Sequence, residues 1–401
     1  MRLPLIMLGC SVLLFLLIDW RIYAAARHRC ASKVPARLQL VSALILCAIL
    51  IVTVCLPRRD GSDSQLLCIM WSLFGILSVY IAKAVFVIVD FIGCLPKFFG
   101  GKRIRCLSLT GGILAVLTFL LVWWGALINR FRVDVREVDV EVPDLPEAFE
   151  GYRIVQFSDL HTGTYGSDTT FVSHLVNCID ALDGDMVVFT GDIVNRHTDE
   201  ILPHVQALSR LDAPDGVYSI LGNHDYGDYS EWPSAEAKQR NLKDLIDIQR
   251  SMGWHLLLNE HDAVVRDGDS IMIIGVENVG DPPFTTYGSL PDAYSSPSDS
   301  NTKILLSHNP AHWQRDIAKC DTMNIALTLS GHTHAMQIEA FGHSPASFRY
   351  RYWGGLYSDP EDDGKRQLYV NIGAGTVGIP MRLGATPELT VITLHRAETK
   401  K

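Results

Sequence analysis

Four long apolar stretches precede residue 128, and they constrain this chain more than any other feature. They are Leu3–Ile18, Leu38–Leu56, Leu66–Val89 and Leu107–Leu127. A helix rises 1.5 Å per residue, so about 20 apolar residues cross the hydrocarbon core of a bilayer. The last three stretches reach that length, and the first needs the residues from Asp19 onward at the interface. Four such stretches joined by basic linkers predict transmembrane helices rather than buried helices of a soluble protein.

The first stretch leaves an alternative open. Ala24, Ala25 and Ala26 form a small-residue site of the kind that signal peptidase cleaves. Against cleavage, Asp19 and Arg21 interrupt the approach to that site. We therefore expect this stretch to remain in the protein as a first helix.

Charge divides the chain into the same two parts. Residues 1–128 contain 13 Lys and Arg against 4 Asp and Glu, a net charge of +9, whereas residues 129–401 contain 22 against 40, a net charge of −18. An acidic domain repels phosphate backbones, which argues against nucleic acid as a partner. The basic linkers suit anionic lipid head groups, and no protein partner can be inferred. We predict a membrane domain over residues 1–128 and a polar domain over residues 129–401.

The distribution of Lys and Arg among the linkers predicts the topology. The first linker carries five and the third four, whereas the middle linker has two that are partly offset by Asp60 and Asp63. Because Lys and Arg accumulate on the cytoplasmic side, the first and third linkers are expected inside. We therefore expect a multi-pass protein of the inner membrane whose polar domain is extracytoplasmic. Lys83 is expected to snorkel toward the third linker. The basic residues of the three linkers are Arg21, Arg27, Arg29, Lys33 and Arg37; Arg58 and Arg59; and Lys97, Lys102, Arg103 and Arg105.

The polar domain alternates short apolar runs with helical stretches, which predicts an α/β sandwich of two sheets flanked by helices. Residues 133–142 are expected to form a strand or hairpin, and Asp267-Gly268 signals a second hairpin. Residues 278–302 and 342–366 are expected to be long loops. Only two of the nine cysteines, Cys178 and Cys320, fall in this domain, so neither a disulfide framework nor a zinc-thiolate cluster is expected. The expected strands are Arg153–Phe157, Met186–Thr190, Val217–Leu221, Ile271–Val276, Ile304–Ser307, Ile325–Leu329, Met336–Phe341, Leu368–Ile372 and Leu389–Leu394, and the expected helices are 168–183, 199–211, 234–252 and 310–319.

Five short polar motifs each follow an apolar run. They are Asp159-Leu160-His161, Gly191-Asp192, Gly222-Asn223-His224-Asp225, Ser307-His308 and Gly331-His332-Thr333-His334. The carboxyl ends of strands are where ligands gather in open α/β sheets, and glycine lets the backbone turn sharply there. Imidazole, carboxylate and amide ligands suit Mn, Fe, Zn or similar ions. Two such ions about 3.5–4 Å apart neutralise a phosphoester and activate water, so the motifs together predict a dinuclear hydrolytic site.

In this order the motifs resemble the calcineurin-like metallophosphoesterase superfamily, over roughly residues 150–395. The segments around these motifs strengthen the resemblance, among them Leu306–Pro310, Ser330–Gln337 and the tail from Asn371 to Glu388. They resemble the bacterial membrane-linked or exported branch, some members of which cleave UDP-2,3-diacylglucosamine.

The resemblance implies a role for each residue. Asp192 would bridge two divalent metal ions, and His224 would protonate the leaving oxygen or stabilise transition-state charge. One departure is Asn195, where related phosphatases often have an Asp that orients the catalytic His. Asn195 and Arg382 are expected to support the site or meet the substrate. The first metal would be held by Asp159, His161 and His334, and the second by Asn223, His308 and His332.

These features together predict a membrane-anchored enzyme that hydrolyses a phosphoester or pyrophosphate bond of a lipid or lipid-linked substrate. The aromatic residues within 348–357 either rest at the membrane interface or pack in the core. One alternative is a UDP-2,3-diacylglucosamine pyrophosphatase in lipid A synthesis, which requires a cytoplasmic domain. Another is a membrane sensor that binds metal without turnover. A nuclease is disfavoured by the acidic domain.

Overall fold

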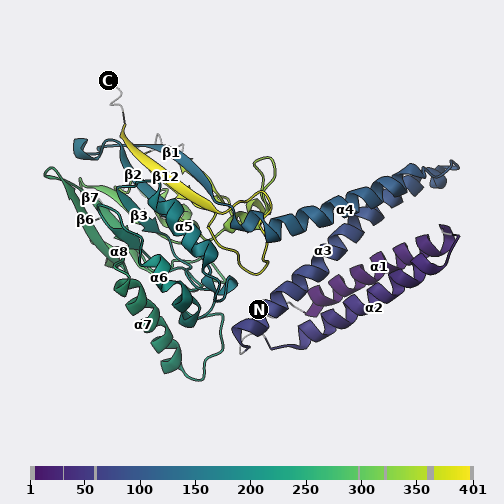
Figure 1. The fold of residues 1–401 in the computed structure, drawn as a ribbon. Coiled ribbons are helices and arrows are strands. Elements are labelled where there is room, and N and C mark those ends of the chain that lie inside the picture. The colour runs from purple at the N-terminus through teal and green to yellow at the C-terminus, as the bar shows by residue number, and fades with distance from the viewer. Residues whose placement is uncertain are drawn as a thin grey trace. The chain divides into compact units, whose positions relative to one another are not determined.

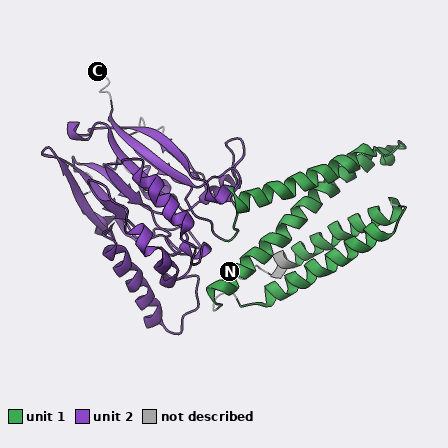
Figure 2. Ribbon diagram, in the orientation of Figure 1, with its two compact units in different colours: residues 1–128, 378–381 green, residues 129–377, 382–401 purple. Residues whose placement is uncertain are grey.

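The protein divides into two compact units, which are described separately (Figure 2). A computed structural model describes residues 5–29, 31–57, 61–296, 299–319, 323–358 and 365–397. The first unit contains residues 1–128 with Gly378–Met381, and the second contains residues 129–377 with 382–401. Within the expected features, Arg58, Arg59, Asp60 and Cys320 lie outside the described residues.

The described part of the first unit forms four long helices, as predicted (Figure 1). Each contains a segment long and apolar enough to cross a membrane. Large apolar side chains such as Leu44 and Leu109 point outward along these helices, which is favourable only where lipid surrounds them. The helices are α1 (Leu5–Arg29), α2 (Val34–Cys55), α3 (Asp63–Cys94) and α4 (Cys106–Leu127), with a short 3-10 helix η1 (Leu95–Phe99) after α3.

A buried carboxylate holds one end of this unit together. Asp90 on α3 accepts hydrogen bonds from Arg21 and Arg29 of α1, at 2.7 and 2.6 Å, and from Arg103 and Ser108 beyond α3. The C-terminal ends of α1 and α3 and the α3–α4 linker therefore lie at the same end of the unit.

Lys83 of α3 does not snorkel as expected. Its Nζ lies 2.7 Å from Asp19 Oδ1 of α1, and its side chain is only 13% exposed. An oppositely charged partner within the unit satisfies the ammonium group better than a long reach to the interface.

The residues described in the second unit form two six-stranded sheets. The strand order is β1-β12-β2-β3-β4-β5 in the first sheet and β10-β11-β9-β8-β7-β6 in the second. Strands β2 to β5 run parallel, as do β7, β8, β9 and β11, so each sheet has one edge where several carboxyl ends meet. The strands are β1 (Asp134–Val142), β2 (Tyr152–Phe157), β3 (Met186–Phe189), β4 (Val217–Ser219), β5 (His255–Leu256), β6 (Glu260–Arg266), β7 (Asp269–Gly275), β8 (Thr302–Leu306), β9 (Leu327–Ser330), β10 (Gly355–Ser358), β11 (Gln367–Val370) and β12 (Glu388–Arg396).

Strand residues alternate between two hydrophobic layers, as the period of two requires. Ile304 and Leu306 of β8 face the layer between the sheets, whereas Leu305 faces the opposite layer, with Trp313 and Ile317. On the outer face of the first sheet, Val155 packs with the residues of three helices. The result is the predicted two-sheet sandwich flanked by helices. The helices of this unit are α5 (Thr170–Asp180), α6 (Val205–Leu208), α7 (Ala235–Ser251), α8 (Leu290–Ala293) and the π-helix η6 (Trp313–Ile317).

Several predicted elements differ in detail. Residues 336–341 are described but form no strand, because His334 to Gln337 all have positive φ and make a 3-10 turn, η7. The helix expected over 199–211 is split into η5 (Thr198–His204) and the short α6, with Pro203 inside the first part. The hairpin at Asp267-Gly268 is confirmed, since it joins β6 to β7 and both residues have positive φ. Residues 134–142 form one strand, β1, rather than a hairpin.

Candidate metal centre

The five motifs all lie where strands of the two sheets end. Asp159 follows β2, Asp192 follows β3 and Asn223 follows β4 in the first sheet. His308 follows β8 and His332 follows β9 in the second. Because these strands are parallel within each sheet, their carboxyl ends bring residues from five distant segments to one place.

The side chains form interlocking groups with the spacing that a metal ion needs. The ligand atoms of Asp159, His161 and His334 lie within 4.8 Å of one another, and so do those of Asp192, His308 and His332. His161 Nε2 is 3.0 Å from His334 Nε2, and His308 Nε2 is 3.3 Å from His332 Nδ1. Each group thus mixes imidazoles with a carboxylate, the donor set preferred by Mn, Fe and Zn.

Asp192 lies between the two groups. Its Oδ2 is 3.7 Å from His161 Nε2 on one side and 3.2 Å from His308 Nε2 on the other. Its Oδ1 accepts a hydrogen bond of 2.8 Å from the backbone N–H of His224, which fixes the carboxylate in this position. A carboxylate held between two sets of imidazoles has the geometry of a bridging ligand.

The backbone at the site is strained. Asp159, His161, Asp192, His332 and His334 have φ between 48° and 75°, in the left-handed region that side chains other than glycine rarely adopt. Such conformations are costly and cluster at functional sites. We infer that packing around the site holds these side chains in place for their chemistry.

Two glycines make this close packing possible. A Cβ at Gly222 would lie 2.2 Å from Asp192 Oδ1, and a Cβ at Gly331 would lie 2.3 Å from Asp159 Oδ2. Any larger residue would therefore displace a carboxylate of the site. This agrees with the expectation that the motif glycines keep side-chain bulk away.

The electrostatics suit a bound cation. Burial alone would raise the pKa of Asp192, but the charges of His308 and His224 hold it well below its usual value. Burial lowers the pKa of His161 and brings that of His332 to about 3, so both imidazoles stay neutral. Burial opposes protonation of His308 as well, yet Asp192 raises its pKa to about 9. Metal binding requires anionic carboxylates and neutral imidazoles, and Asp192, His161 and His332 are already in these states. His308 is protonated beside Asp192 and must lose its proton when a metal ion binds.

Asn223 offers an oxygen to the same space. Its Nδ2 donates to the hydroxyl of Tyr229 at 2.9 Å, while its Oδ1 is buried without a hydrogen-bond partner among the described residues. A buried unpaired amide oxygen is costly unless something else binds it. The donor set and this oxygen together fit a site for metal ions.

His224 is partly exposed, and its ligand atom lies within 4.8 Å of those of His161 and Asp192, one residue from each group. Its ring stacks on Tyr229, with centroids 4.2 Å apart, and its Nδ1 lies 2.7 Å from the backbone carbonyl oxygen of Asn195. A carbonyl can only accept, so Nδ1 carries a hydrogen and Nε2 remains for the substrate. The Asn195 side chain instead donates to Thr164 at 3.2 Å. The main chain at position 195, not its side chain, therefore orients this imidazole.

Arg382 is placed differently from a substrate-contacting residue. It is fully buried, and burial lowers its pKa to about 10. Its guanidinium donates to the backbone carbonyls of Gly375, Ile372 and Ala385, at 2.7, 2.9 and 3.1 Å, and Nη2 lies 3.2 Å from His334 Nδ1. Arg382 therefore supports the loop and the His334 ring from behind.

Residues outside the motifs complete the surroundings of the site. Tyr350 places its hydroxyl 3.1 Å from His332 Nε2, and Phe284 meets the same ring edge-on. Both come from the two long loops, where sequence patterns gave no position for individual residues. Asp225 accepts four backbone N–H bonds and so fixes the loops after β3 and β4.

A groove of about 460 Å³ adjoins Tyr350. Arg315, Arg349 and Arg351 line it, with Asp281 as the acidic lining residue. Arg349 pairs with Asp281 and Arg315 with Asp316, whereas Arg351 lies over the ring of Tyr352. In a domain with a strong negative charge, this local concentration of arginines offers a place for an anionic group. Of the other aromatic residues within 348–357, Tyr352 and Tyr357 are partly buried against the core cluster that contains Trp313, whereas Phe348 is exposed. Tyr357 lies on β10, so the segment expected to be a long loop contains a strand.

Comparison with known proteins finds matches for both parts of the chain. A family described as calcineurin-like phosphoesterase matches residues 152–336. A second family, described as the probable transmembrane domain of calcineurin-like phosphoesterases, matches residues 1–130.

Relatives come from vertebrates and bacteria. A transmembrane protein with metallophosphoesterase domain from Danio rerio is 30% identical over 349 residues, which is 81% of this chain and 73% of the relative. The metallophosphoesterase YkuE of Bacillus subtilis is 31% identical over 282 residues, 68% of this chain and 88% of the relative. A metallophosphoesterase of Campylobacter jejuni is 28% identical, over 70% of this chain and 68% of the relative.

Proposed function

The chain belongs to the calcineurin-like metallophosphoesterase family, and from that premise we propose that it cleaves a phosphoester or pyrophosphate bond in a lipid-associated or envelope substrate. Members of this family are metal-dependent phosphoester hydrolases, and here the domain is anchored by membrane helices. The position of Asp192 between two groups of imidazoles is the observation on which we base the proposal of two metal ions.

We assign seven ligands to two divalent ions, of Mn, Fe, Zn or a similar metal. Bound ions would neutralise the nonbridging phosphate oxygens and lower the pKa of the attacking water. The assignment is supported by the separation of the residues into two groups and by the unpaired Oδ1 of Asn223. The first ion would be held by Asp159, His161 and His334, the second by Asn223, His308 and His332, and both by Asp192.

His224 is assigned the proton transfer. Because the Asn195 carbonyl accepts from Nδ1–H, the ring can give a proton to the leaving oxygen only from Nε2, and it does so as the doubly protonated imidazolium. The same N–H can stabilise charge that develops on the phosphoryl group before transfer is complete. Tyr229, stacked on the ring, keeps the imidazole from rotating away from the groups of ligands.

The groove lined by Arg315, Arg349 and Arg351 supports an anionic substrate. Tyr350 lines this groove, and its hydroxyl lies 3.1 Å from His332 Nε2. An anionic group bound in the groove would therefore lie next to the bond that is cleaved at the metal centre. Guanidinium groups bind phosphates through paired N–H donors, which favours a substrate with a further phosphate or carboxylate beside the scissile one.

The choice between substrate classes depends on topology. An extracytoplasmic domain would meet exported phospholipids, lipid-carrier phosphates or envelope polymers. A cytoplasmic domain would instead favour a nucleotide-linked lipid such as UDP-2,3-diacylglucosamine. The charge of the linkers favours the first class.

Hydrolysis of bis(p-nitrophenyl) phosphate by the purified full chain tests the proposal. We expect chelation to abolish turnover and Mn to restore it. Asp192→Asn should remove nearly all activity and lower the metal content, whereas Asp180→Asn, at a distant and partly exposed carboxylate of α5, should change neither. Full activity after chelation or in Asp192→Asn would overturn the dinuclear assignment, and metal binding without any turnover would favour a sensor.

A further inference from the structure

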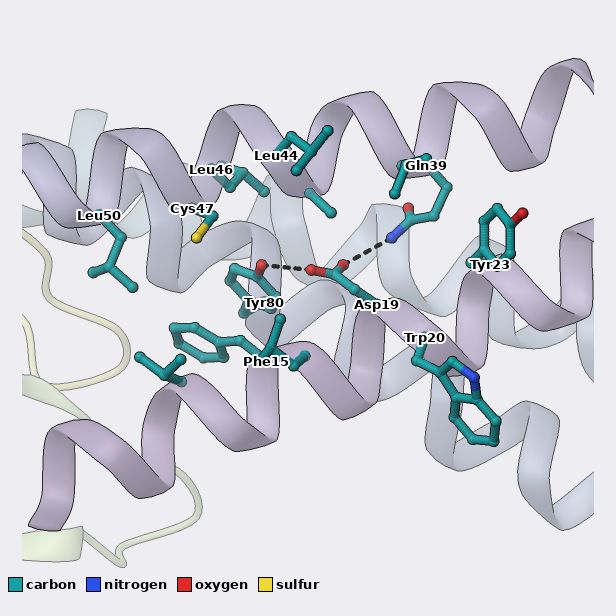
Figure 3. A pocket seen from close by; sticks show the side chains of 14 residues that line it. Phe15, Asp19, Trp20, Tyr23, Gln39, Leu44, Leu46, Cys47, Leu50 and Tyr80 are labelled. Carbon is teal, nitrogen blue, oxygen red and sulfur yellow. Dashed lines mark hydrogen bonds between the residues drawn. The ribbon is translucent and has the colours of Figure 1, made fainter.

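The first unit, which contains the four membrane helices, has a cavity of about 310 Å³ between α1, α2 and α3 (Figure 3). Its walls are apolar along most of their length, with Phe15, Leu46 and Leu50 among them. Phe15 stacks on Tyr80 with ring centroids 3.8 Å apart, which closes one side. The volume lies at the lower end of the range of about 300–1,000 Å³ that small-molecule sites occupy.

The cavity opens toward the surroundings of the helices. Leu16, Trp20 and Leu44, which line it, are also exposed on the outside of the unit. These residues lie in the segments predicted to cross the membrane, so the mouth faces lipid rather than water. A ligand therefore enters from the bilayer, and its hydrocarbon part matches the apolar walls.

Asp19 forms the polar part of the cavity. It is 8% exposed, and it holds three donors: Tyr80 on Oδ2, and Gln39 and Lys83 on Oδ1, each at 2.7 Å. A carboxylate has about four lone-pair positions. Oδ2 thus retains room for one further donor, and no other described residue supplies it.

The charges around Asp19 limit what that donor can be. Lys83 already neutralises Asp19, so a second cation would leave net charge in a low-dielectric setting. An anionic head group would meet the carboxylate of this pair rather than its ammonium group, because Asp19 lines the cavity and Lys83 does not. An uncharged hydroxyl satisfies both limits.

We propose that this cavity is a binding site for a neutral membrane lipid with a free hydroxyl group, such as a diacylglycerol. The hydroxyl donates to Asp19 Oδ2 and one chain fills the apolar space between α1 and α2. Ionisable residues inside a membrane span are costly and commonly mark a functional site, which fits the buried Asp19–Lys83 pair. The proposal is independent of turnover at the metal centre.

Equilibrium binding of radiolabelled 1,2-dioleoylglycerol to the full chain in phosphatidylcholine nanodiscs tests this, with chelator present so that no hydrolysis occurs. We expect saturable binding of one lipid per chain. Leu44→Trp, which fills the cavity, should weaken binding by roughly tenfold or more. Ile45→Trp is the matched control, because Ile45 is a neighbouring exposed residue of α2 that does not line the cavity, and it should bind as the wild type does.

Two further probes test the head group. 1,2-Dioleoyl-3-O-methylglycerol lacks the hydroxyl donor, and 1,2-dioleoyl phosphatidate replaces the hydroxyl by a phosphate. We expect both to compete at least roughly tenfold less well than dioleoylglycerol. Equal competition by either lipid, unchanged binding by Leu44→Trp, or equal losses in Leu44→Trp and Ile45→Trp would overturn the proposal.

Discussion

At the scale of single residues, the orientation of His224 follows from the main chain. The Asn195 carbonyl holds Nδ1, and Tyr229 covers the ring face. Neither contact depends on a carboxylate at position 195. The absence of the Asp that related phosphatases often have there therefore leaves the imidazole oriented, although it removes a nearby negative charge.

His224→Asn should slow turnover by about 10²–10⁴-fold, the usual contribution of a positioned acid or base. The metal content of this variant should be unchanged, because the side chains assigned as ligands all remain. Steady-state kinetics and metal analysis of the same sample measure both quantities. His174→Asn, at an exposed histidine of α5, controls for a general effect of the substitution. Loss of metal from His224→Asn would make this residue a ligand instead.

Asn195→Ala separates the two ways in which position 195 can act. It removes one neutral hydrogen bond, to Thr164, which is worth about 1 kcal/mol. The backbone carbonyl remains, so we expect kcat to fall by less than about tenfold. A loss as large as that of His224→Asn would show that the side chain orients the imidazole after all.

Tyr229 is expected to influence metal affinity without contacting a metal. Its hydroxyl accepts a hydrogen bond from Nδ2 of Asn223 and so directs the Oδ1 of Asn223 toward the other ligands. Removal of such a partner commonly costs about 10–100-fold in metal affinity. Tyr229→Phe should therefore need more Mn for half-maximal activity. Tyr218→Phe should not, because the Tyr218 hydroxyl donates to Asp262 on β6 and contacts no assigned ligand. An unchanged Mn requirement in Tyr229→Phe would mean that Asn223 is oriented by other contacts.

The ligand-type residues could be found from the sequence because each stands in a short motif after an apolar run. The left-handed backbone of Asp159 and Asp192 could not, since only the packed loops impose it. Tyr229, Phe284 and Tyr350 were missed for a related reason. They reach the site from loops, where position depends on tertiary contacts rather than on periodicity.

At the scale of elements, periodicity located most strands and, in the second unit, the helix α7 closely. It failed where local chemistry decides the backbone. The run from Met336 has the alternation of a strand, yet the turn that presents His334 continues through Gln337 with positive φ. The two-residue strand β5 carries too little pattern to be recognised, although it completes the first sheet beside β4.

Asp90 and its arginines connect elements that the sequence shows only as separate linkers. Arg103 donates to Asp90 and to Ser108, whereas Arg105 in the same linker is exposed. Arg103→Gln should lower the stability of the helical unit by about 1.5–3 kcal/mol, the value of hydrogen bonds to a charged group. Thermal unfolding in detergent, followed by circular dichroism, should show a clear drop in Tm for Arg103→Gln and little for Arg105→Gln. Equal Tm values for the two variants would show that the hydrogen bonds of Arg103 do not stabilise the helical unit.

At the scale of the whole molecule, hydropathy and charge predicted a membrane part and an acidic catalytic part, because both properties change abruptly near residue 128. Arg29 was counted with the first linker, but the structure places it in the last turn of α1. There it meets Arg103 of the third linker at Asp90. Both linkers therefore belong to the same end of the helical unit. That arrangement supports an assignment of both linkers to one side of the membrane, but the side itself rests on the rule for Lys and Arg.

The topology can be decided with a reporter that is active only in the cytoplasm. The first and third linkers carry five and four Lys and Arg, against two in the middle linker, so we expect them inside. Since α4 then returns the chain across the bilayer, a reporter fused after Lys401 should be silent. The matched control is a fusion ending at Gly101, in the third linker, which should be bright. Signal cleavage after Ala26 would leave three spans and reverse both results. A bright fusion at Lys401 would turn the domain inward and make a nucleotide-linked lipid the better substrate, whereas a silent one favours exported phospholipids, lipid-carrier phosphates or envelope polymers.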